Sequence, residues 1–244
     1  MFNGADFIVA DASPRILWSQ FYDDHDELIE FYHLNSWNTL RQEPRIARVN
    51  CRPVSYALED IMDPDGWTIT VSTEPEWFER EKYEAALRSA LRDWHAAKII
   101  GSGQHTVSVG EKYVFGTAKV VAQADARVWA FHHAQVTGNT CDRLYGYDSA
   151  TITTIGCNHL FLGGNAHANV TNTVAVTMKS NATCCARRAS TVRHEGRGLL
   201  ELRHYSVGYL ESGIVDAQHS VVILRSEAVT IKNVDSASVV INAF

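Results

Sequence analysis

Long apolar runs are missing from this chain of 244 residues. A helix that crosses a membrane needs about 20 consecutive apolar residues, and no stretch approaches that length. The N-terminus, Met1 to Asp6, also lacks the basic and apolar segments of a signal peptide. Hydrophobic residues still make up 45% of the chain, which is enough for a sizeable core. We therefore expect a soluble, cytoplasmic protein without a membrane partner.

Cysteine is scarce, and recognisable catalytic motifs are missing. The five cysteines are odd in number and form no tight framework, which favours reduced thiols over a disulfide scaffold. The chain has no glycine-rich phosphate loop, no His-x-x-x-His zinc pattern, and no nucleophile, base and orienting residue at a familiar spacing. The acidic run Asp23 to Asp26 is better explained by helix capping than by a metal, because consecutive residues do not converge on one ion. The sequence predicts a protein that is not an enzyme and has no cofactor or metal.

Charge is divided unevenly along the chain, whose net charge is −6. Residues 1–100 contain 10 basic and 18 acidic residues, whereas residues 101–244 contain 12 and 10. Such an acidic domain has a solvated surface, docks on a basic partner, or imitates nucleic acid. Its repulsion of phosphates argues against nucleic-acid binding by the chain.

What the chain does contain is an eight-residue repeat between Ala118 and Leu202. One position of each octad is apolar, and a small residue stands two positions before it in most octads. A spacing of two places these residues on one side of a β-strand, and the residues between them supply turns. The repeated positions are Val120, Val128, Val136, Leu144, Ile152, Leu160, Ala168, Val176, Cys184, Val192 and Leu200.

Eight residues are too few to enclose a core, so we expect two octads, or sixteen residues, in each coil of a parallel β-helix. The spacing between Leu200 and Val215 is fifteen, which we attribute to a one-residue deletion near Tyr205 to Gly208. With that irregular octad included, sixteen octads predict about eight coils. After the deletion the period continues in a shifted register at Val215, Ile223, Ile231 and Val239.

The first hundred residues do not repeat and hold five of the six tryptophans. Strands are expected at 7–10, 45–50, 56–61 and 67–71, with a turn at 63–66. Helices are expected after Ser13-Pro14 and at 24–33. Thr73 and Glu76 match a capping box at the start of a helix over 75–98, which ends before Gly101-Ser102-Gly103.

The predicted fold is therefore an acidic α+β domain, residues 1–100, followed by an all-β solenoid, residues 104–244. The first coil of a solenoid exposes unpaired backbone, and such an edge invites aggregation unless it is covered. We expect the acidic domain to cap that coil.

The octad Asp148-Ser149-Ala150-Thr151-Ile152-Thr153 resembles the octads of bacterial ice-nucleation proteins and of octad-repeat proteins from bacteria and phages. The resemblance extends over about residues 110–244 and implies sixteen-residue β-solenoid coils. Ice binding would require outward threonine pairs on successive coils. The positions equivalent to Thr151 and Thr153 on the coils before and after are Gln135/Thr137 and His167/Asn169, which argues against that function.

Stacking by sixteen also places two unusual columns side by side: Arg127, Arg143 and His159 next to Trp129, Tyr145 and Phe161. We call these six residues the Arg/aromatic face. Neighbours within a column should lie about 5 Å apart. Aromatic rings beside cations suit a protein hot spot, a nucleic-acid base with its phosphate, or a sugar. Alternatively, the acidic domain or a second subunit covers this face, or the rings only stabilise the stacked coils.

The chain ends in an apolar segment without a charged or proline-rich terminator. A last coil of this kind leaves an open edge, and two such edges can pair across a two-fold axis. We therefore predict a homodimer through the C-terminal coils, formed by Val239, Val240, Ile241 and Phe244.

These features lead to one preferred function and two alternatives. The preferred function is a non-enzymatic interaction protein, a rigid scaffold that dimerises and binds a protein partner through the acidic domain or the Arg/aromatic face. By analogy with phage repeat proteins, that partner is a host protein that the chain inhibits. The first alternative is a β-helical protein that binds or cleaves polysaccharide, but the acidic residues of the solenoid do not stack into a carboxylate pair. The second is nucleic-acid binding along Arg127, Arg143 and Arg193.

Overall fold

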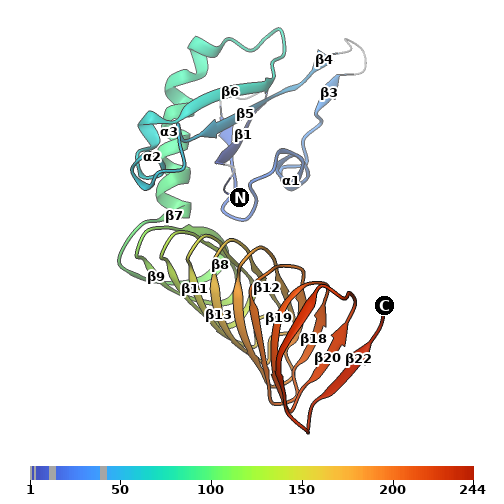
Figure 1. Cartoon of the computed structure of the whole chain (residues 1–244). Coiled ribbons are helices and arrows are strands. Elements are labelled where there is room, and N and C mark those ends of the chain that lie inside the picture. Colours follow the sequence, from blue (N-terminus) through green and yellow to red (C-terminus); the bar gives the residue numbers. More distant parts are fainter. Residues whose placement is uncertain (1, 3, 11–14, 39–42) are drawn as a thin grey trace. The chain divides into compact units, whose positions relative to one another are not determined.

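The computed structural model describes residues 2, 4–10, 15–38 and 43–244 and divides the chain into two compact units, residues 1–99 and 100–244 (Figure 1). The first unit is a small α/β region, and the second is a parallel β-solenoid, so the predicted fold class is confirmed. The helix start expected at Ser13-Pro14 lies outside the described residues. Capping of the first coil by the acidic domain stays a prediction.

The first unit is built on a four-stranded antiparallel sheet. Its core is closed by the longest helix, where Trp94 packs edge-on against Trp67 with ring centroids 5.9 Å apart. The strand order is β2 (Ile16–Leu17), β1 (Ala5–Ala10), β5 (Ile46–Arg52) and β6 (Thr68–Thr73). The remaining elements are α1 (His25–Phe31), the hairpin β3 (Trp37–Asn38) and β4 (Glu43–Pro44), α2 (Leu58–Met62), the short 3-10 helix η1 (Pro64–Gly66) and α3 (Arg80–Lys98). No helix in the described part of the chain has both the length and the apolar character that a membrane crossing demands.

Two sequence predictions in the first unit are wrong. The strand expected at 56–61 is instead a turn followed by the helix α2, whose entry is organised by Ser55: its Oγ donates to Asp60 and accepts from the Ala57 N–H. The capping box at Thr73 does not form, because Thr73 extends β6 and pairs with Arg48. The helix therefore begins at Arg80, five residues later than predicted.

The aspartate cluster of the first unit is a helix cap and an ion-pair partner. The Asp24 carboxylate accepts from the N–H groups of Asp26 and Glu27 at the start of α1. Asp26 pairs with Arg48 at 2.9 Å. Asp23 points to the far end of α3, where its Oδ1 lies 2.7 Å from the Lys98 Nζ. The three carboxylates therefore serve three separate structural contacts.

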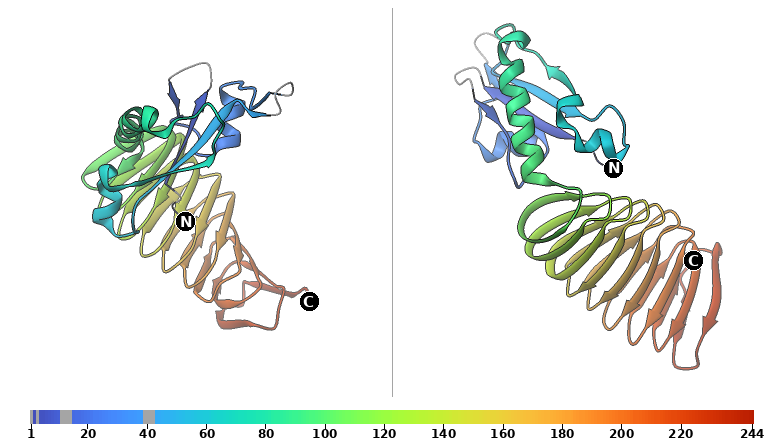
Figure 2. Two further views of the ribbon diagram at one scale, coloured as in Figure 1. Left: turned by 90° about the horizontal axis from the view of Figure 1, so that it is seen from above. Right: turned by 90° about the vertical axis from the view of Figure 1, so that its left-hand side faces the viewer.

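The second unit winds into about nine parallel turns, whose strands stack along the solenoid axis (Figure 2). One turn more than predicted is present because β8 forms a coil ahead of the first octad. The entering strands are β7 (Ile99–Ile100), β8 (Gln104–Val114), β9 (Lys119–Ala130) and β10 (Gln135–Gly146).

After β10 each coil contributes two separate strands, so that the 16-stranded sheet continues from β10 as two arms. We call the outward sides of these arms the first face and the second face. The first face continues through β11 (Thr151–Ile155), β13 (His167–Thr171), β15 (Thr183–Arg187), β17 (Leu199–Arg203), β19 (Gly213–Gln218) and β21 (Val229–Val234). The second face continues through β12 (His159–Leu162), β14 (Ala175–Met178), β16 (Thr191–His194), β18 (Val207–Leu210), β20 (Val221–Leu224) and β22 (Val239–Asn242).

The octad positions from Val120 to Leu200 form the core of the solenoid, as predicted. Each of these eleven side chains is at most 2% exposed. Residues sixteen apart are in register, for example Val136 with Ile152 and Leu144 with Leu160. Burial of these apolar columns is the main stabilising term, because an isolated coil has no interior of its own.

The corners between strands are set by residues in the left-handed backbone region. Asp148 has φ 54° and Gly164, one coil later, has φ 61°. A Cβ on Gly164 would lie 2.8 Å from the Asp148 backbone nitrogen, so this corner requires glycine for space as well as for its backbone angle. The turn residues that interrupt the octads thus determine where each coil bends.

The predicted deletion lies at a different corner. Strands β16 and β18 keep the sixteen-residue register through His194 and Leu210, so no residue is lost near Tyr205 to Gly208. The next strand pair joins Leu199 to Ile214, which places the deletion after Leu210. A further residue is lost before β20, because Val207 pairs with Val221. Ile223 consequently lies on the second face, and Val222 and Leu224 point inward in its place.

Candidate interaction surfaces

The Arg/aromatic face is assembled by three successive coils on the second face. Arg127, Arg143 and His159 are in register, and so are Trp129, Tyr145 and Phe161, so the structure brings together all six predicted residues. Trp129 and Tyr145 stack with ring centroids 4.5 Å apart and an interplanar angle of 5°. Tyr145 and Phe161 are 6.5 Å apart and tilted by 40°. The aromatic column is therefore a continuous ladder.

A second aromatic ladder, which the sequence prediction missed, runs along the adjacent corner. Phe115 stacks on Phe131 at 4.9 Å, and Phe131 stacks on Tyr147 at 5.2 Å. Tyr147 then meets Phe161 at 5.6 Å, where the two ladders converge. Gly163 leaves room there, since a Cβ would lie 3.3 Å from the Tyr147 ring. The signal was present in the sequence, because these residues also recur every sixteen positions.

The two ladders stabilise the stack of coils. Each good aromatic pair contributes about 0.5–1.5 kcal/mol beyond the area it buries. Phe115 and Phe131 are buried, whereas Trp129, Tyr145 and Phe161 keep an intermediate exposure. The Arg/aromatic face therefore presents the edges of rings that already have fixed positions.

Acidic neighbours balance the arginines of this face. The Arg127 Nε lies 3.1 Å from the Asp142 carboxylate, and its Nη1 lies 3.9 Å from Glu111. Arg143 approaches the same Asp142 at 3.6 Å. The face is thus of mixed charge, which suits a protein surface better than the phosphates of a nucleic acid.

The last coil leaves the predicted dimerisation residues uncovered. Val239, Val240, Ile241 and Phe244 are 53%, 40%, 45% and 63% exposed. They lie on or directly after β22, which pairs only with β20 and has a free edge in the described residues 100–244. Ile231 of β21 is in register with the buried Val215, yet it is 42% exposed, because within the described residues 100–244 β21 pairs with β19 alone.

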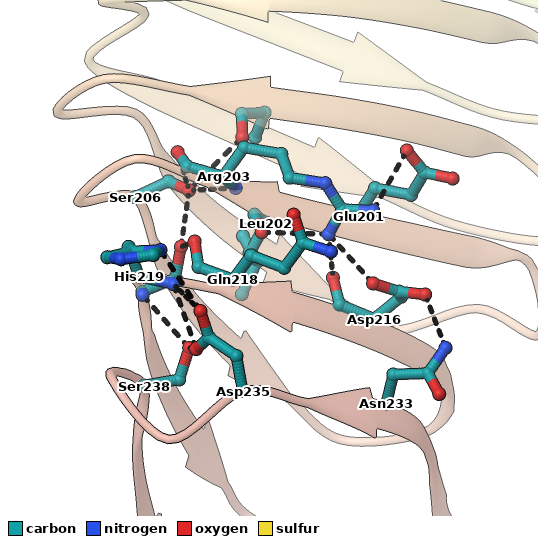
Figure 3. Close-up of polar contacts among 12 residues, drawn as sticks. Glu201, Leu202, Arg203, Ser206, Asp216, Gln218, His219, Asn233, Asp235 and Ser238 are labelled. Carbon is teal, nitrogen blue, oxygen red and sulfur yellow. Dashed lines mark hydrogen bonds and ion pairs between the residues drawn. The ribbon is translucent and has the colours of Figure 1, made fainter.

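Polar contacts join the last coils of the first face (Figure 3). The Arg203 Nη1 donates to Asp216 Oδ1 at 2.8 Å, and the Asn233 Nδ2 donates to Asp216 Oδ2 at 2.8 Å. The Asn233 hydrogen bond and the Arg203 guanidinium hold the pKa of Asp216 below its usual value. This network links β17, β19 and β21 in the region where the sixteen-residue register is lost.

A histidine, an aspartate and a serine meet at the neighbouring corner, but they do not form a catalytic triad. The His219 Nδ1 lies 3.0 Å from Asp235, and the Ser238 Oγ donates to the same carboxylate at 2.5 Å (Figure 3). Ser238 is therefore bonded to the acid rather than to the imidazole that would activate it. Asp235 also accepts from the His219 backbone N–H, so the group closes a turn.

All five cysteines are buried free thiols. Cys141 and Cys157 share a hydrogen bond, and this bond together with burial raises the pKa of the Cys141 thiol. Cys157 also donates to the His159 carbonyl at 3.1 Å. The pair is packed inside the solenoid, with both thiols buried.

Comparison of the chain with protein-family models, with curated proteins and with solved structures gave no match. The function proposed below therefore rests on the residues and surfaces of this chain.

Proposed function

We propose that the chain is a non-enzymatic interaction protein, a rigid β-solenoid scaffold that forms a homodimer and binds a protein partner through the Arg/aromatic face. The open C-terminal edge is the observation that carries this proposal. Its apolar side chains are costly to leave in water, and its unpaired backbone groups offer a template for a further strand. A second copy of the same edge covers these side chains and pairs with these backbone groups.

The dimer forms across a two-fold axis at β22. A two-fold axis brings two copies of one strand together in antiparallel orientation, so that their free N–H and C=O groups pair. Val240 and Ile231, which point toward the interior of the last coil, then meet the same residues of the partner. The two solenoids become one continuous core.

We expect Val240→Lys to convert the dimer into a monomer. Val240 is in register with the buried Val222, so a lysine at this position carries its charge into the apolar contact, and desolvating that charge costs more than the contact contributes. Light scattering after size-exclusion chromatography should give twice 27.2 kDa for the unaltered chain at micromolar concentration and 27.2 kDa for the variant. The matched control is Val174→Lys, because Val174 is a 64% exposed corner residue away from the last coil, and this variant should remain a dimer. A 27.2 kDa mass for the unaltered chain would contradict the dimer.

The Arg/aromatic face is the proposed binding surface for the partner. Aromatic residues and arginine dominate protein hot spots, and side chains that are already fixed lose little entropy on binding. The mixed charge supplies orientation. The likeness of the octads to those of phage and bacterial octad-repeat proteins supports a role as an inhibitor of a bacterial host protein.

Charge reversal at the rim of this face should abolish partner binding without disturbing the ladders. Arg143→Glu places a negative charge beside Asp142 at an exposed position, so the fold is retained while the surface potential changes sign. The full-length chain is immobilised, and the proteins retained from a bacterial lysate are identified by mass spectrometry. We expect a retained protein that Arg143→Glu loses and that Lys119→Glu, on the first face, still binds. Identical retention by both variants would contradict the assignment of this face.

A further inference from the structure

The first face has a hollow in its C-terminal half, lined by residues of β11, β13, β15 and β17 and of the two corners that follow β15 and β17. The hollow has a volume of about 440 Å³. Thr171 and Cys185 are short side chains on adjacent coils that line the hollow. The longer Arg187 and Arg203, which also line it, are in register with Thr171 on the next two coils.

The lining is rich in cations. Arg187, Arg188 and Arg203 all contribute to it, against one acidic residue, Glu201. Arg203 is already compensated, because it binds Asp216 at 2.8 Å and Glu201 at 3.5 Å. Neither Arg187 nor Arg188 forms an ion pair with any residue that the structure describes, and both are exposed. The hollow therefore holds two positive charges without a counter-charge.

The backbone under these arginines is strained and firmly held. Arg188 and the next residue, Ala189, have φ 46° and 38°, and His204 and Tyr205 repeat this pair of left-handed residues on the next coil. The Oγ of Ser190, which is buried, donates to the carbonyl groups of Arg187 and Arg188, at 2.8 and 3.2 Å. Single left-handed residues form corners along the whole solenoid, whereas two stand in succession at each of these two corners. The two guanidinium groups are thus presented from a fixed corner.

We propose that this hollow binds the phosphate group of a small ligand. A phosphate monoester carries a charge of about −1.5 to −2 at pH 7, which matches the two uncompensated arginines, whereas a single carboxylate leaves one of them unpaired. Guanidinium groups bind phosphate oxygens through paired N–H donors. The hydroxyl of Thr171, which lines the hollow, supplies a further, neutral donor. None of these groups belongs to the Arg/aromatic face or to the open edge.

Isothermal titration of the full-length chain with inorganic phosphate at low ionic strength tests the site. We expect saturable binding with one phosphate per chain. Arg187→Gln and Arg188→Gln should each weaken it by about tenfold or more, because each removes a charge-assisted hydrogen bond. The matched control is Arg197→Gln, an exposed arginine at the opposite corner of the same coils, which should bind as the unaltered chain does. Circular dichroism verifies that all three variants are folded.

Three outcomes would overturn the proposal. Phosphate binding that survives both substitutions at the hollow would show an adventitious ion only. Acetate that binds as tightly as phosphate would show that a single negative charge suffices. A single-stranded oligonucleotide with a 5′-hydroxyl end that displaces phosphate, and that depends on Arg187, would assign the hollow to a nucleic-acid backbone instead.

Discussion

Replacing Leu144 by Ala should lower the free energy of unfolding of the solenoid by about 2–5 kcal/mol, the usual cost of truncating a fully buried leucine. Leu144 is 1% exposed and stacks between Val128 and Leu160, with coils on both sides of it. The strands on both sides are held by the hydrogen bonds of their own coils. The cavity therefore has little room to collapse, which places the loss toward the upper end of that range.

Far-ultraviolet circular dichroism during urea denaturation measures this loss, because the solenoid contributes most of the strand signal. Thr137→Ala is the matched control, since Thr137 lies on the same strand with its side chain exposed. That change should alter the free energy of unfolding by no more than about 0.5 kcal/mol. Equal losses for both substitutions would mean that the octad column is not the core.

Replacing Lys98 by Ala should destabilise the first unit by about 3–5 kcal/mol, because it removes the ammonium group that lies against a nearly buried carboxylate. The side chain of Lys98 is fully buried, and that of Asp23 is 11% exposed. Their charged atoms lie 2.7 Å apart, and the Trp94 Nε1 donates to the same Asp23 oxygen at 2.8 Å. The lysine Nζ also donates to the Tyr22 carbonyl at 3.2 Å.

Tryptophan fluorescence reports this transition, since five of the six tryptophans belong to residues 1–100. The double variant Asp23→Asn with Lys98→Met should recover most of the loss, because it removes both charges and keeps an acceptor for Trp94. Lys82→Ala, on the exposed side of the same helix, should change little. A double variant as unstable as Lys98→Ala would show that packing, rather than the unpaired charge, sets the cost.

The repeat region was largely predictable because its signal is periodic. From Val120 to Leu200 an apolar residue recurs every eight positions, and every second one of these stacks on the same column of the solenoid. The irregular region after Leu200 was predicted less well, because a lost residue can be absorbed at any corner. The hydrogen bonds between β16 and β18 show that the register survives to Leu210.

In the first unit, local signals competed with tertiary pairing. Thr73 and Glu76 have the spacing of a capping box, but pairing with Arg48 draws Thr73 into the sheet. Residues 56–61 contain apolar residues typical of a strand, yet Ser55 and Asp60 form contacts that start a helix. The secondary structure of such short segments is determined by the tertiary contacts that they form.

The surface features were also predictable only where they are periodic. The Arg/aromatic columns were predicted by counting in steps of sixteen residues, and the ladder of Phe115, Phe131 and Tyr147 could have been predicted in the same way. The ion pairs could not be predicted by the same counting, because they depend on the directions of the side chains. Arg127 pairs with Asp142, fifteen residues later, whereas Arg187 forms no ion pair with a described residue.

The sequence by itself determined that residues sixteen apart stack in a parallel solenoid, since alternation along a strand and the octad period are local properties that no partner needs to supply. Only the tertiary structure decided which corner absorbs each missing residue, which arginines keep an uncompensated charge, and where the first face is hollow. Those features depend on hydrogen bonds and ion pairs between coils. These features are therefore determined by contacts with the neighbouring coil and not by the local sequence.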